Sequence, residues 1–253
     1  MLRTRVIPCL LLSGKRLVKT KQFKSPAYIG DPINAIKIFN DKEVDELLLF
    51  DIDATVKKTG PNFKFIEEIA GECFMPLAYG GGIQSLNDIE RLNKIGVEKI
   101  VMSSVAIYNK SFLREAVREF GSSTIVVCLD VKKNFWGNYE VYTHSGAKRT
   151  GVGPVSFSKE LKEVGIGELI INSIDRDGTY KGYDIELLSR IVKNVDMPVV
   201  ACGGAGSLEH FAEAVKISGV SAVSAGSLFV FYGSNRAVLI NYPNSDELEV
   251  LFK

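Results

Sequence analysis

The sequence predicts an α/β fold, a single (β/α)₈ barrel built from two repeated half-barrels. The length of 253 residues is close to the ~250 that such a barrel typically needs. Short apolar runs alternate with amphipathic stretches along the whole chain, and the second half of the sequence repeats the first. No Pro/Gly/Ser-rich linker divides the chain, so we expect residues 1–253 to form one domain.

Eight apolar runs are mostly continuous, as is typical of parallel strands covered on both faces. They lie at residues 6–12, 47–52, 75–79, 99–102, 124–131, 169–172, 199–202 and 222–225. Helical patterns follow them at residues 32–43, 62–71, 86–95, 112–120, 157–164, 185–195, 208–217 and 234–239. Ser85, Asp184 and Ser207 stand where helix N-caps belong.

Two further segments stand beside this alternation. Residues 139–150 contain a Ser145-Gly146 turn and predict a β-hairpin inserted after the fifth strand. Residues 13–30 form a long basic loop after the first strand, which could close as a lid over a phosphorylated substrate. A solvated charged loop is the other interpretation of that segment.

The internal repeat has a period of about half the chain, which fits two half-barrels better than a solenoid. At an offset of 122, residues 46–53 align with residues 168–175, and Gly81-Gly82 aligns with Gly203-Gly204. One residue later, Ser104 matches Ser227. At an offset of 119, the first strand overlays the fifth, so that Leu11 corresponds to Asp130.

Composition excludes several classes of protein. Lys and Arg number 31 against 30 Asp and Glu, a net charge of +1, which argues against a nucleic-acid binder. No apolar run approaches the ~20 residues needed to cross a bilayer, and the apolar N-terminal run is too short, and broken by Pro8, for a signal peptide. Four dispersed cysteines and two histidines indicate neither a metal site nor a cofactor. We expect a cytoplasmic protein.

Two glycine-rich turns follow predicted strands, at residues 80–82 and 203–206, and each precedes a serine and a helix. Glycine lets the backbone approach an anion closely, and the N–H groups at the start of a helix are free to bind it. Because these turns are duplicated at matching strand ends, the sequence predicts two phosphate sites at the carboxyl end of the barrel, where active sites of such barrels lie. The alternative is that the glycines only make tight turns.

Asp130 is the candidate catalytic acid or base, because it closes the apolar strand at residues 125–130. A partly desolvated carboxyl group there can have a raised pKa and transfer protons. A loop cap or an ion-pair partner is the alternative role. Asp51, Asp53, Asp175 and Asp177 are further candidates at strand ends, and of these Asp51 and Asp175 are better interpreted as structural or site-orienting.

Four strands begin with a charged residue at the opposite end of the barrel: Arg5, Glu46, Lys99 and Glu168. Charges at a strand terminus are usually just solvated. Two cations and two anions around one opening could instead form a salt-bridged ring that gates the bottom of the barrel.

Several segments resemble HisF, the cyclase subunit of imidazole glycerol phosphate synthase, and the similarity covers nearly the whole chain. The similar segments are residues 5–10, 30–32, 44–47, 80–83, 173–179 (Ser-Ile-Asp-Arg-Asp-Gly-Thr), 182–184 and 203–206. The resemblance implies a barrel that pairs as a heterodimer with a glutaminase subunit. In that family, ammonia released at the barrel bottom passes through the barrel to the active site.

The resemblance also implies roles for individual residues. It gives the gate role to Arg5, Glu46, Lys99 and Glu168. It implies a substrate contact at Lys19 and phosphate contacts at Gly82, Ser103, Ser104, Asp177, Gly178, Gly204, Gly226 and Ser227. The substrate would be a phosphorylated or nucleotide-linked small molecule.

The chain departs from the family at three places. Histidine-pathway members carry two catalytic aspartates, and here Leu11 occupies the position of one of them. Ser103-Ser104 replaces Asn-Thr, and the run Leu11-Leu12-Ser13-Gly14-Lys15 replaces Asp-Val-Lys-Asp-Gly. The chain is more similar to a divergent branch associated with surface polysaccharide (lipopolysaccharide, O-antigen) synthesis, whose reaction is thought to be amidination of an acetamido sugar. A rival hypothesis is a non-catalytic subunit that conducts ammonia to a separate ligase.

Overall fold

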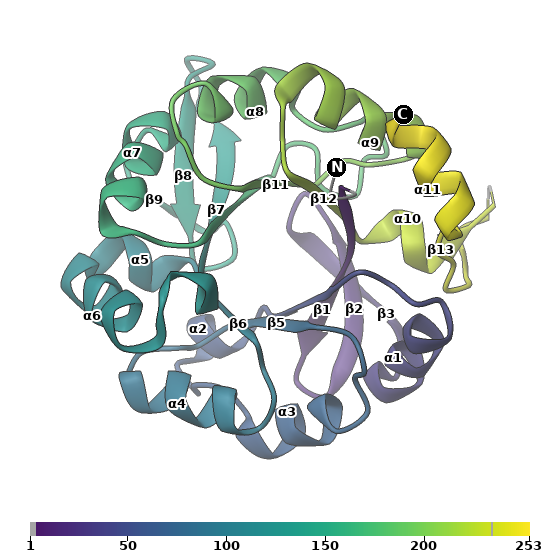
Figure 1. Ribbon diagram of the computed structural model, residues 1–253, viewed down its shortest axis with the longest axis horizontal. Helices are drawn as coiled ribbons and strands as arrows, with labels where there is room; N and C mark the ends of the chain where they lie inside the picture. Colours follow the sequence, from purple (N-terminus) through teal and green to yellow (C-terminus); the bar gives the residue numbers. More distant parts are fainter. Residues whose placement is uncertain (1–3, 234) are drawn as a thin grey trace.

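The computed structural model describes residues 4–233 and 235–253. Eight parallel strands form a closed barrel, and helices surround them, so the predicted (β/α)₈ class is confirmed (Figure 1). The barrel strands are β1 (Arg5–Ser13), β4 (Leu47–Asp51), β5 (Leu77–Gly80), β6 (Lys99–Met102), β7 (Ile125–Lys133), β10 (Glu168–Ser173), β11 (Val199–Cys202) and β12 (Ala222–Ala225). Pairing of β12 with β1 and of β7 with β10 completes the ring.

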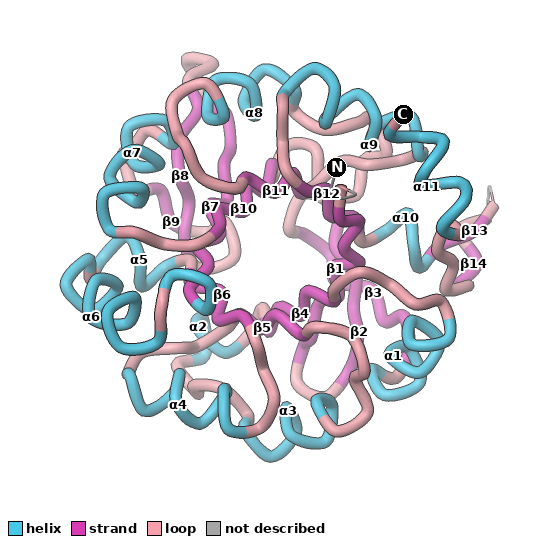
Figure 2. Tube along the Cα trace, in the orientation of Figure 1, coloured by secondary structure: helices cyan, strands magenta, loops and turns pink. Residues whose placement is uncertain are grey.

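Helices cover the outside of the barrel, as the ring of cyan segments in Figure 2 shows. They are α1 (Pro32–Asp41), α2 (Ala54–Lys57), α3 (Phe63–Ala70), α4 (Leu86–Lys94), α5 (Ser104–Tyr108), α6 (Lys110–Phe120), α7 (Pro154–Val164), α8 (Ile185–Val192), α9 (Leu208–Glu213), α10 (Ser227–Val230) and α11 (Ser245–Phe252). The cap of α4 is a capping box, in which Ser85 and Asp88 each accept the other's backbone N–H. No helix among the described residues is long and apolar enough to cross a membrane.

Two apolar cores hold this arrangement. The larger lies between the barrel and the helices, and includes the fully buried Phe39, Tyr79 and Phe157. The smaller fills the inside of the barrel with Ile7, Val126 and similar side chains. Strands that are buried on both faces require continuous apolar runs, and for this reason the sequence predicted their positions.

Two β-hairpins extend the barrel sheet. The segment at 13–30, expected to be a basic loop, is a hairpin of β2 (Arg16–Lys21) and β3 (Lys24–Gly30). Strand β2 also pairs with the carboxyl-terminal residues of β1. The segment expected to be a loop is therefore a paired β-hairpin, and its possible closing over a substrate stays a prediction. The hairpin predicted at 139–150 is confirmed as β8 (Tyr139–Thr143) and β9 (Lys148–Arg149), with β8 also paired to β7.

The last helix of the alternation was placed wrongly. In the described part of the segment expected to be helical at 234–239, the chain forms β14 (Ala237–Val238), which pairs antiparallel with β13 (Phe231–Tyr232). Residue 234 lies outside the described residues. The final helix comes later, as α11, where Asn244 and Glu247 form a second capping box. Apolar residues 237–240 suit either a helix or a strand, and only pairing with β13 decided between them.

Candidate functional site

A cavity of about 570 Å³ opens at the carboxyl ends of the barrel strands. Its lining includes every residue that the sequence predicted for substrate, phosphate and acid–base roles: Lys19, Gly82, Ser103, Ser104, Asp130, Asp177, Gly178, Gly204, Gly226 and Ser227. These residues come from β2 and from six of the barrel strands or the loops that follow them, and the closed barrel brings them to one opening. The two glycine-rich turns lie on the same cavity, as the repeat predicted.

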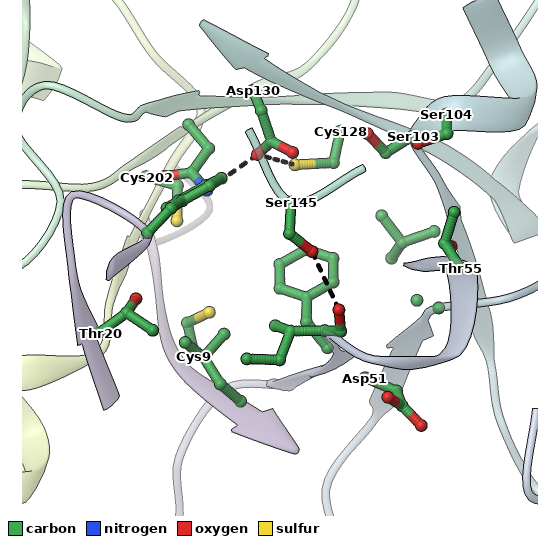
Figure 3. A pocket seen from close by; sticks show the side chains of 18 of the residues that line it. Cys9, Thr20, Asp51, Thr55, Ser103, Ser104, Cys128, Asp130, Ser145 and Cys202 are labelled. Atoms are coloured by element: carbon green, nitrogen blue, oxygen red, sulfur yellow. Dashed lines mark hydrogen bonds between the residues drawn. The ribbon is translucent and has the colours of Figure 1, made fainter. Parts of the chain in front are cut away.

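Asp130 lies on the upper wall of this cavity in Figure 3, beside Cys128. Burial raises the pKa of its carboxyl group to about 7, and the nearby Asp177 carboxylate adds to the increase. Asn172 opposes these effects, because its Nδ2 donates to Asp130 Oδ1 at 3.1 Å. A carboxyl group with a pKa near neutrality is suited to both accepting and donating a proton.

Asn172 was missed by the sequence reasoning. Its side chain is only 9% exposed, and its Oδ1 has no hydrogen-bond partner among the described residues. A buried acceptor left without a donor is unusual, and it lines the cavity next to Asp130. The signal that could have found it is a polar residue interrupting the apolar run of β10, where the repeat places Phe50 in the first half.

The Lys19 side chain extends from β2 to the cavity wall near Gly226, on the side of the second glycine-rich turn. Its side chain is buried, and its Nζ donates to the Cys9 backbone carbonyl at 2.5 Å. A Cβ added to Gly226 would lie 2.0 Å from this Nζ, so the absence of a side chain at Gly226 makes room for the cation. A buried ammonium beside the Gly226-Ser227 turn favours binding of an anion there.

Asp177 is held by the same hairpin. Thr20 donates its hydroxyl proton to Asp177 Oδ2 at 3.1 Å, and burial raises the pKa of the carboxyl group. Gly178 packs so closely that a Cβ there would lie 2.6 Å from the Thr20 carbonyl oxygen. The hairpin of β2 and β3 therefore fixes the loop after β10 that carries Asp177 and Gly178.

The cavity wall around the first glycine-rich turn has different contacts from the wall around the second. The Gly82 N–H donates to the Thr55 hydroxyl at 3.2 Å, and Ser104 Oγ accepts the His144 N–H at 3.1 Å. Gly82 has φ +71°, and a Cβ there would lie 2.8 Å from that of Ala54. No buried cation comparable to Lys19 lines this side among the described residues; Lys58, which lines it, is exposed.

The turn between β8 and β9 crosses the mouth of the cavity. Ser145 donates its hydroxyl proton to the Ile52 carbonyl at 2.9 Å, a contact drawn in Figure 3. A Cβ on Gly146 would lie 2.9 Å from the Phe23 ring, which comes from the turn between β2 and β3. Two hairpins thus meet over the opening, and no sequence pattern placed them together.

Asp51 lies on the side of the cavity opposite Asp130 (Figure 3), but it is bound by the backbone. Its Oδ1 accepts the N–H groups of Asp53 and Ala54 at 2.9 and 3.0 Å. These bonds fix the turn after β4, and burial raises the pKa of the carboxyl group. This agrees with the structural role predicted for Asp51. Leu11, which lies on the cavity wall near Phe50, gives this half of the mouth an apolar surface.

The four predicted gate residues meet at the amino end of the barrel. Arg5 pairs with both Glu46 and Glu168, and Lys99 Nζ lies 2.7 Å from Glu46 and 2.9 Å from Glu168. The two carboxylates are nearly inaccessible to solvent, and the two cations are partly exposed. The charges therefore form a closed ring of four ion pairs, and the apolar inner core separates it from the cavity.

No cluster of three or more His, Cys, Asp or Glu side chains among the described residues has the arrangement of a metal site. The four cysteines are free thiols, and three of them, Cys9, Cys128 and Cys202, line the cavity.

Comparisons with known proteins identify the family of the chain. A family model described as histidine biosynthesis protein matches residues 5–235. A relative from Pseudomonas aeruginosa, hisF2, is 50% identical over 250 residues, which is 99% of this chain and 100% of the relative. One from Leptospira borgpetersenii is 49% identical over the full length of both chains, and hisF3 of Vibrio vulnificus is 46% identical over 98% of this chain and 95% of its own. The names of all three assign them provisionally as imidazole glycerol phosphate synthase subunits.

Proposed function

The chain belongs to the histidine biosynthesis family, in its HisF group, and we propose that it is a synthase subunit that adds ammonia to a phosphate-bearing substrate. Asp130 is the acid–base group of this proposal, and the observation that carries it is the position of its carboxyl group on the cavity wall, where Asn172 donates to it at 3.1 Å and burial raises its pKa. When ammonia attacks a carbon atom, its nitrogen becomes positive until a proton leaves. The Asp130 carboxylate is placed to accept that proton at neutral pH.

Phosphate groups of the substrate would lie at the two glycine-rich turns. Gly82, Ser103 and Ser104 form the first, and Gly178, Gly204, Gly226 and Ser227 form the second. Backbone N–H groups and, at the second turn, the Lys19 ammonium supply the positive potential. Asp177 would position this second site through its contacts with the Lys19 hairpin.

Ammonia would enter through the opposite end of the barrel. The ring of Arg5, Glu46, Lys99 and Glu168 closes that end, and a glutaminase of the HisH type would dock there. Between the ring and the cavity lie the apolar side chains of the inner core, small ones such as Ala78 and Ala222 together with larger ones such as Ile7. An apolar passage suits neutral ammonia and disfavours ammonium and water. We expect this heterodimer in the cytoplasm, where free thiols persist.

Leu11 directs the choice of reaction. It replaces the second carboxylate that a histidine-pathway cyclase uses, and it makes that half of the mouth apolar. We therefore favour the acetamido-sugar amidination that supports lipopolysaccharide-type polysaccharide over cyclisation of the histidine precursor. In this amidination the ammonia nitrogen replaces the carbonyl oxygen, which leaves as water with two of the ammonia protons. The rival hypothesis of a non-catalytic ammonia conduit is also motivated by Leu11, while the raised pKa of Asp130 counts against it.

The partner is tested by co-expression with the cognate glutaminase. A one-to-one complex in size-exclusion chromatography and a change in glutaminase activity are expected. A chain that stays alone at micromolar concentration, with glutaminase activity unchanged, would refute the pairing. Complementation of a histidine-requiring strain then separates the two reactions, because the amidination proposal expects no growth.

The gate is tested with Lys99→Met, which removes a cation and keeps an unbranched side chain. Turnover with glutamine should fall relative to turnover with free ammonium, which bypasses the glutaminase. Lys110→Met is the matched control, since Lys110 pairs with Glu160 on the exposed surface. Equal effects of the two variants on the glutamine-to-ammonium ratio would contradict a gate role.

A further inference from the structure

A second cavity, of about 510 Å³, lies outside the mouth of the first. Gly178 lines both, so the second cavity begins where the second predicted phosphate turn ends. Its walls are the end of β2, the loop after β10 and the β13–β14 hairpin. That hairpin is the segment where the sequence had indicated a helix.

This outer cavity is positive and lacks acidic residues. Lys21 and Arg236 line it, and no Asp or Glu does so among the residues that the structure describes. Neither cation forms a salt bridge within the described chain. Two unpaired cations beside an anion-binding turn extend its positive potential outward.

The same cavity also presents aromatic surface. The Arg236 guanidinium lies 4.7 Å from the centroid of the Phe231 ring and 5.2 Å from that of Tyr180. Tyr232, on β13, is 62% exposed, so its ring is available to a ligand. Flat guanidinium and tyrosine surfaces are those on which nucleobases stack.

Tyr180 joins the aromatic surface to the phosphate turn. Its hydroxyl donates to the Ser227 carbonyl at 3.3 Å and accepts from Arg236 Nη2 at 3.5 Å. A Cβ on Gly206 would lie 2.4 Å from the Tyr180 carbonyl oxygen, so this loop packs tightly in its place. A ligand that has a phosphate at Ser227 would therefore pass along Tyr180 into the outer cavity.

We propose that the outer cavity binds the nucleoside of a nucleoside-diphosphate-linked substrate. The diphosphate would lie from the Gly226-Ser227 turn toward Lys21, and the base would stack against Tyr232 and Arg236. A ligand with a single phosphate would leave this cavity unused. A nucleoside has a flat base, which the aromatic rings of the cavity would contact, and a polar edge, which the Asn241 amide would contact. This assignment of the substrate class rests on the proposed function of the second phosphate turn.

The test measures binding of inorganic pyrophosphate and of UDP, CDP, ADP and GDP to the full chain by titration calorimetry. At least one nucleotide should bind about tenfold or more tightly than pyrophosphate. Tyr232→Ala should lower the affinity for that nucleotide about fivefold or more and leave pyrophosphate affinity within twofold. Arg236→Ala should weaken the nucleotide at least as much.

Tyr28→Ala and Arg16→Ala are matched controls, because Arg16 lies over the exposed Tyr28 ring on the other hairpin. Neither should change nucleotide binding. Nucleotides no tighter than pyrophosphate, or equal effects of Tyr232→Ala and Tyr28→Ala, would overturn the nucleoside site and leave the phosphate turn intact. Failure of all five ligands to bind would overturn the phosphate turn as well.

Discussion

The two halves of the barrel mouth share one backbone plan and differ in chemistry. Each half contributes a glycine-rich turn and a serine that begins a short helix, Ser104 of α5 or Ser227 of α10. In the first half, Leu11 and Phe50 face the cavity, where the second half has Asp130 and Asn172. Ser103 of the first half corresponds to Gly226 of the second, which makes room for Lys19.

Both halves keep the glycine turns because both halves have the same backbone structure. Only the side of the mouth formed by the second half has an acid–base group and a buried cation, so one such group at the mouth is enough for each role. The turns are held by close backbone approaches in both halves: a Cβ on Gly81 would lie 2.6 Å from the Asp51 carbonyl oxygen, and one on Gly204 would lie 2.2 Å from that of Gly182. A side-chain substitution such as aspartate to leucine leaves that backbone plan intact. The second half could therefore hold the acid–base group alone.

The largest expected effect comes from removing that group. Asp130→Asn should lower turnover with ammonium by about 10² to 10⁴, the usual contribution of a general acid or base. The limb of the pH–rate profile near pH 7 should disappear, because it reports the Asp130 pKa. Asp51→Asn, on the opposite side, should change turnover far less, since an amide oxygen can still accept the N–H groups of Asp53 and Ala54.

Thermal unfolding of Asp130→Asn tests the raised pKa of Asp130 independently of turnover. The folded-state pKa of Asp130 is raised above its unfolded value, so ionisation of this partly buried group opposes folding. Its contribution to stability should fall as pH rises from about 4 to about 7. Asp130→Asn should therefore raise the Tm more at pH 8 than at pH 4. An equal change at both pH values would contradict a raised pKa.

Leu11→Asp should make the first half resemble a two-carboxylate cyclase. We expect negligible conversion of the histidine-pathway nucleotide intermediate by the unmodified chain, even with ammonium at high pH, and at least tenfold more by the variant. The assay is steady-state turnover with free ammonium, and Leu11→Asn, which adds polarity without a carboxylate, is the control. Turnover by the unmodified chain at the rate of an ordinary cyclase would instead show that Leu11 is tolerated.

Gly226→Ala tests the asymmetry in cation placement. The new Cβ would lie 2.0 Å from Lys19 Nζ, the mobile end of a long side chain, so the cation should move and the fold should remain. Phosphate binding at the second turn should weaken about tenfold, by calorimetry, with the first turn unaffected. Ser103→Gly, the reciprocal change, should alter binding by twofold or less. Equal weakening by both changes would mean that Lys19 has no special role.

The smallest expected effect is that of Asn172→Leu, which places an apolar side chain next to the Asp130 carboxyl group. Loss of the Asn172 hydrogen bond should raise the Asp130 pKa further, because that bond favours the ionised form. The pH–rate midpoint should move to higher pH, with about a 3- to 10-fold loss at pH 7. A midpoint that does not move would show that Asn172 does not act through Asp130.

The sequence by itself determined the barrel, the duplicated turns and the position of Asp130. These features are local: a buried parallel strand needs a continuous apolar run, and a turn that approaches other backbone closely needs glycine. The charges at the starts of β1, β6 and β10 were also legible, and barrel closure alone implied that they would meet.

Only the tertiary structure decided how distant segments meet at the mouth. The Lys19 side chain reaches Gly226 because β2 pairs with β1, and Ser145 reaches Ile52 because a hairpin crosses the opening. The outer cavity exists because residues 237–238 pair with Phe231 and Tyr232 and do not form a helix. Such contacts join residues far apart in sequence, and their free energy depends on packing in the folded chain, which no local pattern of residues encodes.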